Sequence, residues 1–457
     1  MSQGMRWDRL LSEARLGDPK PVRPRLPNRS PFMQDYDRIV FSAPFRRLQD
    51  KTQVHPLPQS DYVRRRLTHS LEVSCIGRSL GIEIGYFLKD QGLLPGHIPP
   101  EDLGFIVAAS CLAHDIGNPP FGHAGEEVIG GWFAQASAPG HPLSATLNQG
   151  LTRDQLADFV DFEGNAQGFR IVARRQMYQD EGGLRLTLAT LGAGLKYPCL
   201  RASPARAAHK GKSSRKYGAF QAEAHWLDEV ALGSGMLKRG DGLYARHPLS
   251  FLMEAADDIA YAVVDLEDGL KLDYLSAADV ISALDRLAGG GLDLSRAGRD
   301  DFRKVEYLRA RAIGNLVEAA ARVFRERHRD ILSGDFDDAL IAHTPLAEAH
   351  DHATKTLALP RIFRSKAVIR MEIKGFQAVG DLMDRFAGAA IRAHGDGVSA
   401  LDARHWRLVP DLPELVKGKA PDGAGLYDTL LAVTDFVSGM TDGYALKLHR
   451  ELTGSAG

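Results

Sequence analysis

The sequence predicts an all-α fold. Apolar residues recur every three or four positions over long stretches, which is the spacing of a buried helix face. Pro and Gly separate these stretches, and no series of alternating apolar and polar residues stands out as a set of strands. At 457 residues the chain is long enough for two or three domains of roughly 150 residues each.

The composition is that of a folded globular protein, with 44% hydrophobic and 25% charged residues. The net charge of -1 gives no overall attraction to nucleic acid or to a membrane surface. The three cysteines lack a C-x-x-C spacing, residues 1–11 lack the apolar segment of a signal peptide, and no stretch approaches the ~20 apolar residues of a membrane-spanning helix. We therefore expect a cytoplasmic protein without membrane contact.

The helical spacing recurs along most of the chain. It predicts helices over 35–48, from Arg64 to the Gly and Pro that follow residue 91, and over 103–113, 157–175, 248–271, 302–327, 361–394 and 426–452, the last with a break near Gly439. The segments between them carry the residues that end helices.

Four segments lack a clear helical pattern. Pro and Arg crowd residues 15–31, which predicts an extended basic arm over 1–34, either solvated or bound to a partner. Prolines predict a loop over 53–58, and residues 184–192 fit a short helix or a strand. Between 201 and 216 there are six Lys or Arg and no acidic residue, which predicts a mobile basic loop.

The stretch after residue 103 is unusual for a core helix. The apolar helix ends in the adjacent pair His114 and Asp115, breaks at a Gly and two Pro, and is followed by His123 and Glu126. Burying such a pair without partners would cost on the order of several kcal/mol, so the pattern favours a chemical site over a plain core.

Two further helices offer residues of the same kind. His69 lies in the first turn of the helix that opens near Arg64. In the helix over 248–271, Asp257, Tyr261 and Asp265 follow one another at steps of four and so share one face. A lone His at a helix start is more often a cap or a surface residue, so each of these features is weak alone.

Together, His69, His114, Asp115 and Asp257 form a set of two imidazoles and two carboxylates. Such a set suits one divalent ion of Mn, Fe, Co, Ni or Mg, whereas a closed structural zinc site prefers thiolates. The pattern therefore indicates a mixed nitrogen and oxygen metal site.

Several strings extend this pattern beyond the four candidate ligands. They are RRLQDKTQ at 46–53, RLTHSLE at 66–72, the stretch 114–126, FEGNAQ at 162–167 and EAADDIAY at 254–261. His69, His114, Asp115 and a later Asp match the H…HD…D pattern of the HD-domain metal phosphohydrolases. The strings together resemble the bacterial deoxyguanosine triphosphate triphosphohydrolases of that group, clearly over about residues 28–275.

The resemblance implies a fold and a domain division. The expected fold is an HD-domain helical bundle with additional helical segments packed on it. We expect an HD core over 35–275 that includes an insertion over 127–247, and a helical C-terminal part over 276–457 packed on the same domain.

Of the two adjacent acids at 257 and 258, Asp257 is the expected metal ligand, because its helix face continues through Tyr261.

The resemblance also implies an activity, the hydrolysis of a deoxynucleoside triphosphate at the α-phosphorus. The substrate is dGTP or several dNTPs, and the products are the deoxynucleoside and inorganic triphosphate. His123 is the candidate acid for the leaving 5′-oxygen, with Glu126 on the same helix face to orient its ring. A base that aligns water would use the same His123, and a His bonded to nearby backbone is the non-catalytic alternative.

Four more residues are expected to contact the substrate by resemblance. Gln53 would contact the sugar or base and Arg66 a phosphate, while Tyr261 and Asp265 would contact the sugar. A core aromatic and a solvated acid are the plain alternatives for the last two. Some relatives carry a phosphate-binding Lys after the metal-binding Asp, where this chain has Asp258, so other cations must bind the phosphates.

Two other functions fit the sequence. The same site in an HD-domain phosphohydrolase could act on another nucleotide, or the chain could be an oligomeric nucleotide-sensing or single-stranded DNA-binding protein. The family often forms symmetric tetramers or hexamers, so we expect a homo-oligomer, with single-stranded DNA or an effector nucleotide as a further partner.

Overall fold

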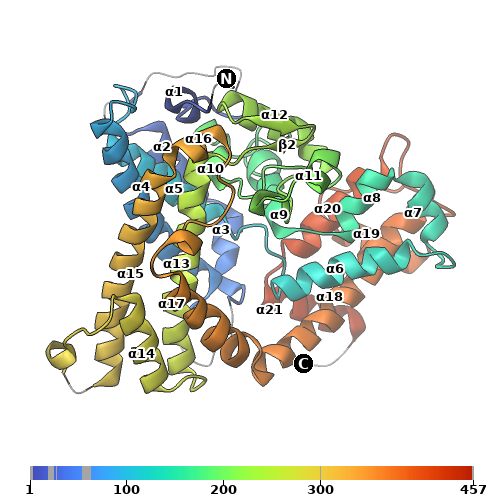
Figure 1. Cartoon of the computed structure of the whole chain (residues 1–457). Helices are drawn as coiled ribbons and strands as arrows, with labels where there is room; N and C mark the ends of the chain where they lie inside the picture. The colour runs from blue at the N-terminus through green and yellow to red at the C-terminus, as the bar shows by residue number, and fades with distance from the viewer. Residues whose placement is uncertain (1–3, 19–24, 27, 54–62, 299, 455–457) are drawn as a thin grey trace.

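A computed structural model describes residues 4–18, 25–26, 28–53, 63–298 and 300–454. Within these ranges the only strands are β1 (Lys238–Gly240) and β2 (Leu243–Tyr244), which pair antiparallel as a short hairpin. All remaining regular structure is helical, which confirms the all-α class (Figure 1). No helix among the described residues is both long enough and apolar enough to cross a membrane.

The first hydrophobic core surrounds α13 (Pro248–Lys271), which packs against α4 (Arg66–Asp90) and α5 (Pro100–Ala113). Gly81 lets helices α4 and α5 approach closely. A Cβ at this position would lie 2.5 Å from the Leu103 carbonyl oxygen, which is too close. The shorter or outer helices of this part are α1 (Trp7–Leu10), α2 (Pro31–Val40), α3 (Ala43–Arg47), α10 (Leu188–Gly194), α12 (Ala224–Gly233), α14 (Ala277–Leu287), α15 (Asp301–Glu326), α16 (His328–Ser333) and α17 (Ala347–Asp351).

The second hydrophobic core joins the middle of the chain to its C-terminal part. Its helices are α6 (His123–Ala136), α7 (Ser144–Gly150), α8 (Arg153–Val160), α18 (Lys366–Ala393), α19 (Ala400–Leu408), α20 (Leu426–Ser438) and α21 (Asp442–Thr453). Figure 1 shows α6 lying along α18, although the two helices are more than two hundred residues apart. The stretch that follows His114 therefore runs from the first core into the second.

The remaining regular elements are short segments between these helices. They are α9 (Gly164–Arg170), the π-helical turn η2 (Ile171–Arg175), α11 (Pro204–Ala208), the 3₁₀ turns η1 (Leu48–Asp50), η3 (Lys212–Ser214), η4 (Gln221–Glu223), η5 (Leu294–Ala297) and η6 (Ile341–His343), and the π-helical segment η7 (His352–Phe363).

The predicted extended basic arm over 1–34 is wrong for the residues described there. Trp7 and Leu10 of α1 are buried in the first core, as is Leu16. Arg15 is buried too, and its Nη1 lies 2.6 Å from the Asp35 carboxylate. These apolar and paired side chains bind the segment to the core, which composition alone did not indicate.

Residues 19–24 and 27 of the predicted arm lie outside the described residues, as do residues 54–58 of the predicted loop.

Three other segments differ from the predicted elements. The predicted helix over 157–175 is interrupted between α8 and α9, and the one over 361–394 is interrupted before Ser365, which caps α18. The predicted basic loop over 201–216 contains α11 and η3 and is tied down by ion pairs such as Lys212 with Glu254 at 3.0 Å. Its acidic partners come from distant segments, so the local charge count overstated its freedom. Residues 184–192 lead into α10, which is a helix.

Candidate active site

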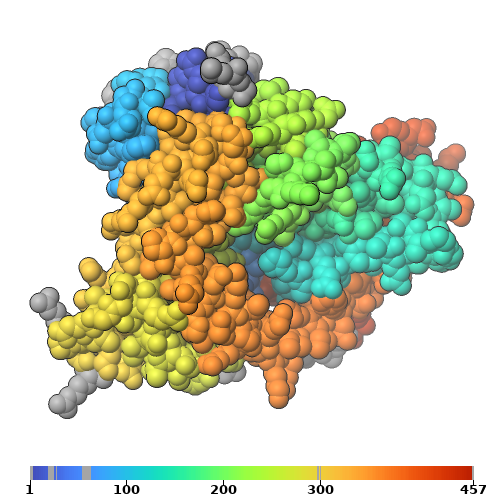
Figure 2. Space-filling model, in the orientation of Figure 1, coloured from blue at the N-terminus to red at the C-terminus, as the bar shows by residue number. Residues whose placement is uncertain are grey.

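A cavity of about 740 Å³ lies where the two cores meet. Figure 2 shows the surface hollowed between the segments of α6, of residues 196–216 and of η7 with α18. The cavity is lined by residues of α4, α13, η7, α18 and the turn between α5 and α6. This volume falls in the range of roughly 300–1,000 Å³ that is usual for small-molecule sites.

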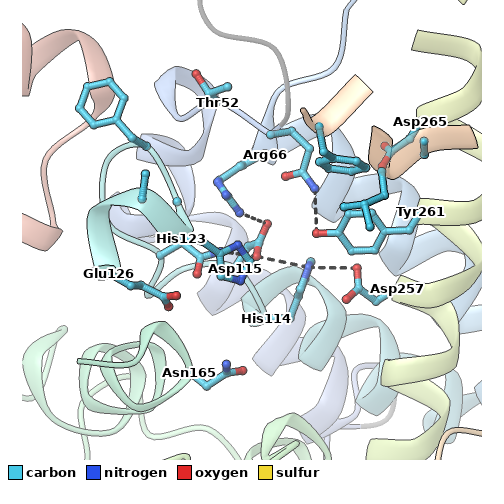
Figure 3. Close-up of a pocket in the computed structure, with 18 of the residues that line it drawn as sticks. Thr52, Arg66, His114, Asp115, His123, Glu126, Asn165, Asp257, Tyr261 and Asp265 are labelled. Atoms are coloured by element: carbon cyan, nitrogen blue, oxygen red, sulfur yellow. Dashed lines mark hydrogen bonds and ion pairs between the residues drawn. The ribbon is translucent and has the colours of Figure 1, made fainter. Parts of the chain in front are cut away.

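The four predicted metal ligands come together beside the cavity, and three of them, His114, Asp115 and Asp257, line it. His69 comes from α4, His114 and Asp115 follow the end of α5, and Asp257 comes from α13. One ligand atom each from His69, His114 and Asp115 lies within 4.8 Å of the other two. Oδ1 of Asp257 lies 3.2 Å from Nε2 of His69 and 3.6 Å from Nε2 of His114. Figure 3 shows Asp257 facing His114 from the opposite helix.

The state of His114 fits a cation. Its Nδ1 lies 2.6 Å from the Cys111 carbonyl oxygen, which can only accept, so Nδ1 carries a proton and Nε2 is the ring nitrogen that could bind a metal. That Nε2 is buried and has no hydrogen-bond partner. It lies instead 3.6 Å from both Asp115 and Asp257. A ring nitrogen beside two carboxylates, with the other ring nitrogen held by a carbonyl, is the donor set of a divalent metal site.

The two carboxylates of this cluster are held in the ionised form. Burial alone would raise the pKa of Asp115, but the Arg66 guanidinium, with Nη1 2.8 Å away, and His114 lower it well below its usual range. Burial would likewise raise the pKa of Asp257, and His114 and His69 lower it. Ionised oxygens are the form that binds a divalent cation.

His123 begins α6 after a turn with unusual backbone geometry. Phe121 and Gly122 both have positive φ, at 63° and 60°. Gly122 combines φ of 60° with ψ of −127°, a backbone conformation that glycine adopts far more readily than residues with a Cβ. Burial, together with Lys216 and Arg66, lowers the pKa of His123, so its ring favours the neutral form.

Glu126 does not orient His123 in the way that the sequence predicted. Its Oε1 accepts a hydrogen bond of 2.7 Å from the Gly164 backbone N–H, and none of the hydrogen bonds among described residues joins it to His123. The N-terminus of α9 attracts this carboxylate across the cavity wall, a contact that helix spacing cannot reveal. Burial and the neighbouring Glu163 raise the pKa of Glu126 to about 7, although Lys216 opposes them.

The four predicted substrate contacts all line the same cavity. Nε2 of Gln53 donates to the Tyr261 hydroxyl at 3.3 Å, and the Tyr261 ring lies 5.3 Å from the His69 ring. Asp265 lies one helical turn further along α13, and its buried Oδ2 has no hydrogen-bond partner. Figure 3 shows Tyr261 and Asp265 on one side of the cavity and His123 with Glu126 on the other.

Comparison with known proteins agrees with this site. The HD domain matches residues 66–144 and the phosphohydrolase-associated domain matches residues 341–451. The chain is 42% identical to the deoxyguanosinetriphosphate triphosphohydrolase-like protein of Pseudomonas aeruginosa (strain LESB58) over 98% of this chain and 99% of that one. The protein of the same description from Synechocystis sp. is 41% identical, with the same two coverages. The chain belongs to the deoxyguanosinetriphosphate triphosphohydrolase-like family.

A more distant member of this family is the deoxyguanosinetriphosphate triphosphohydrolase of Klebsiella pneumoniae (strain 342), which is 32% identical over 92% of this chain and 93% of its own length. The resemblance inferred from the sequence is thus confirmed. The HD match contains His69, His114 and Asp115, whereas Asp257 on α13 lies outside both matched regions. The phosphohydrolase-associated match contains the part of the cavity wall formed by η7 and α18.

Several cavity residues gave no recognisable signal in the sequence. Lys196 and Tyr197 follow α10 and line the cavity, as does Lys355 of η7. They belong to no periodic pattern, and they lie far along the chain from His69, His114 and Asp115. Lys216, which the sequence placed in a basic loop, also lines the cavity, and its Nζ lies 3.1 Å from Glu163.

Proposed function

We propose that this protein hydrolyses deoxynucleoside triphosphates, dGTP or several dNTPs, to the deoxynucleoside and inorganic triphosphate. One observation carries the proposal. A single cavity joins a His and Asp cluster suited to a divalent cation, a set of lysine and arginine side chains, and a tyrosine beside two orphaned polar atoms. The metal cluster would bind the scissile phosphate, the lysine and arginine side chains the phosphate chain, and the tyrosine the sugar. The names of the family members support the same substrate class.

His69, His114, Asp115 and Asp257 would hold the divalent ion. A metal bound there would polarise a phosphoryl oxygen and lower the pKa of a bound water. Manganese and magnesium are the ions we propose first, because imidazole and carboxylate ligands accept both and cellular supply decides between them.

The triphosphate would bind to cations that replace the lysine missing at position 258. Arg66, Lys196 and Lys216 all line the cavity. Nζ of Lys196 lies 3.3 Å from Glu254, and Nζ of Lys216 lies 3.1 Å from Glu163. These acids raise the pKa of each lysine against the opposing effect of burial, so both remain charged. We propose that they bind phosphate oxygens in the complex.

The sugar would lie against Tyr261. Asp265 and Gln53 each have one buried oxygen without a hydrogen-bond partner, and both border the tyrosine side of the cavity. Two buried oxygens without partners are suited to hydrogen bonds with the hydroxyl of a deoxyribose. A ribose would add a 2′-hydroxyl against the Tyr261 ring, and we propose that this contact excludes ribonucleotides.

His123 would handle the proton of the leaving 5′-oxygen. Its ring is neutral at neutral pH in the free protein, because burial and two nearby cations lower its pKa. The negative charge of a bound triphosphate would offset those cations and raise the proton affinity of the ring. In this proposal Glu126 holds Gly164 at the cavity wall and does not orient the His123 ring by a hydrogen bond.

We further propose a cytoplasmic homo-oligomer, a tetramer or a hexamer. All three cysteines are unpaired, which suits a reducing compartment. Ile369, Ile373 and Phe376 are exposed on successive turns of α18, and a second subunit would cover them. Sedimentation velocity would test this, since a monomer at micromolar concentration contradicts it.

The activity is tested by product identification. Purified protein is incubated with each of the four dNTPs and Mn²⁺, and the products are separated by anion-exchange chromatography. Deoxyguanosine and triphosphate in equal amounts support the proposal. Formation of dGMP or dGDP would instead indicate a phosphohydrolase of another specificity. Asp257→Asn serves as the matched inactive control.

A further inference from the structure

Asp442 connects the C-terminal part of the chain to the active site. It is the first residue of α21, and its side chain is 1% exposed. Its Oδ1 accepts a hydrogen bond of 2.9 Å from the Phe121 backbone N–H, and its Oδ2 accepts one of 3.0 Å from the Thr52 backbone N–H. One carboxylate therefore holds two segments of the cavity wall that are themselves far apart in the sequence.

Lys51 makes a second connection beside the first. Its Nζ donates to the Asn118 carbonyl at 2.5 Å and to the Ser438 carbonyl at 3.0 Å, and the residue is 3% exposed. Ser438 ends α20. The turn between α20 and α21 therefore contacts the active-site turn, residues 114–122 between α5 and α6, through both Lys51 and Asp442.

The two segments held in this way carry residues of the proposed mechanism. Phe121 lies two residues before His123, and Asn118 donates through Nδ2 to Oδ1 of Asp115 at 2.5 Å. Lys51 also accepts the Arg66 backbone N–H through its carbonyl, at 3.3 Å. A displacement of Asp442 would therefore reach both the proton-handling residue and the residue that pairs with Asp115.

The active-site turn needs an external hold because of its backbone geometry. Phe121 has φ of 63°, a conformation that a residue with a Cβ adopts at an energetic cost. A hydrogen bond to a carboxylate is stronger than one to a neutral acceptor, and the N-terminus of α21 favours a negative charge at Asp442. The bond from the Phe121 N–H is thus suited to keep the turn in its strained form.

We infer that Asp442 is a positioning residue of the active site, and that the α20–α21 turn of the phosphohydrolase-associated domain fixes His123 and Arg66 through Asp442 and Lys51. This inference rests on the proposed function for its catalytic readout. It gives this domain a role in turnover besides its contribution to the second hydrophobic core.

Asp442→Asn tests the inference with little change in shape. The amide keeps one acceptor oxygen, but its NH₂ group faces the second backbone N–H and cannot accept from it. Misplacement of a catalytic group by about 1 Å can cost on the order of 100-fold in rate. We expect kcat to fall about 10-fold to 100-fold, while KM for the dNTP and the affinity for Mn²⁺ change by less than about threefold.

Asp402→Asn is the matched control. Asp402 is also a buried acid in the first turn of a helix of the same domain, but its partners are Ser399 and Arg392 and it does not line the cavity. We expect this variant to lose thermal stability and to keep kcat. Equal losses of kcat in both variants, or a kcat of Asp442→Asn within twofold of wild type, would overturn the inference.

A second variant, Lys51→Met, and amide hydrogen exchange test the same inference if Asp442→Asn does not fold or if the protein lacks the proposed activity. If Asp442→Asn does not fold, Lys51→Met must show the same fall in kcat with little change in KM, and unchanged kcat there would refute the inference. If the wild-type protein does not release triphosphate, the proposed function fails separately. Faster amide exchange at Thr52 and Phe121 in Asp442→Asn, without change in α5, would then still support the positioning role, and unchanged exchange would refute it.

Discussion

Arg66→Met removes the buried charge that pairs with a metal-ligand carboxylate. Nη1 of Arg66 lies 2.8 Å from Oδ2 of Asp115, and both residues are 6% exposed. Methionine fills much of the space of the arginine stem but leaves Asp115 with only the neutral amide of Asn118 as a close hydrogen-bond donor. The carboxylate then becomes a buried charge without a cationic partner on that side.

The expected loss follows from the burial of the pair. Removing one partner of a buried ion pair typically destabilises a protein by about 3–5 kcal/mol. Unfolding entropy is about 2.1 cal/mol/K per residue, so for 457 residues about 1 kcal/mol corresponds to about 1 °C in Tm. We therefore expect metal-free Arg66→Met to melt about 3–5 °C below the wild-type protein at pH 7.

Thermal unfolding with and without Mn²⁺ measures this effect. A divalent ion held by His69, His114, Asp115 and Asp257 would supply positive charge beside the orphaned carboxylate, so Mn²⁺ should raise Tm more in Arg66→Met than in the wild type. Arg325→Met is the control, since the pair of Arg325 with Glu83 is exposed and contributes less than about 1 kcal/mol. A metal-free Tm for Arg66→Met no lower than that of Arg325→Met would refute the reasoning.

Three further predictions test the proton, the sugar and a buried acid. His123→Ala should lower kcat by roughly 100-fold or more while calorimetry shows unchanged binding of Mn²⁺ and nucleotide, and unchanged turnover would remove His123 from the mechanism. Tyr261→Ala opens space beside the sugar and should raise kcat/KM for GTP relative to dGTP by about tenfold, or about 1.4 kcal/mol; an unaltered ratio would assign sugar selection elsewhere. Burial raises the pKa of Asp158 from 3.8 to about 7, so the protonated carboxyl favours the folded state. This stabilisation is fully present below pH 3.8 and is lost as the pH rises through 7. Asp158→Asn should therefore lose less unfolding free energy than the wild type between pH 4 and pH 8 in urea titrations, and equal losses would contradict the assignment.

The sequence was informative where a residue's role depends on its own helix. The spacing of Asp257, Tyr261 and Asp265 predicts one helix face, and the structure places all three at the cavity. The pair His114 and Asp115 was recognisable because an apolar helix rarely ends in two such side chains. Local periodicity and local chemistry were sufficient in these cases.

The missed features depend on contacts between distant segments. The carboxylate of Glu126 turns to Gly164, which is 38 residues further along the chain. Arg15 is buried because Asp35 receives it, although the segment around it reads as a solvated arm. Asp442 contacts Phe121 across 321 residues. Spacing within one helix carries no information on such pairs, because they are fixed by how the two hydrophobic cores pack together.

The proposed attack of water on the α-phosphorus can be tested by isotope labelling. The protein is incubated with dGTP and Mn²⁺ in H₂¹⁸O, and both products are analysed by mass spectrometry. The account predicts one ¹⁸O in the inorganic triphosphate and none in the deoxyguanosine. An ¹⁸O label in deoxyguanosine, or release of pyrophosphate or phosphate in place of triphosphate, would contradict it.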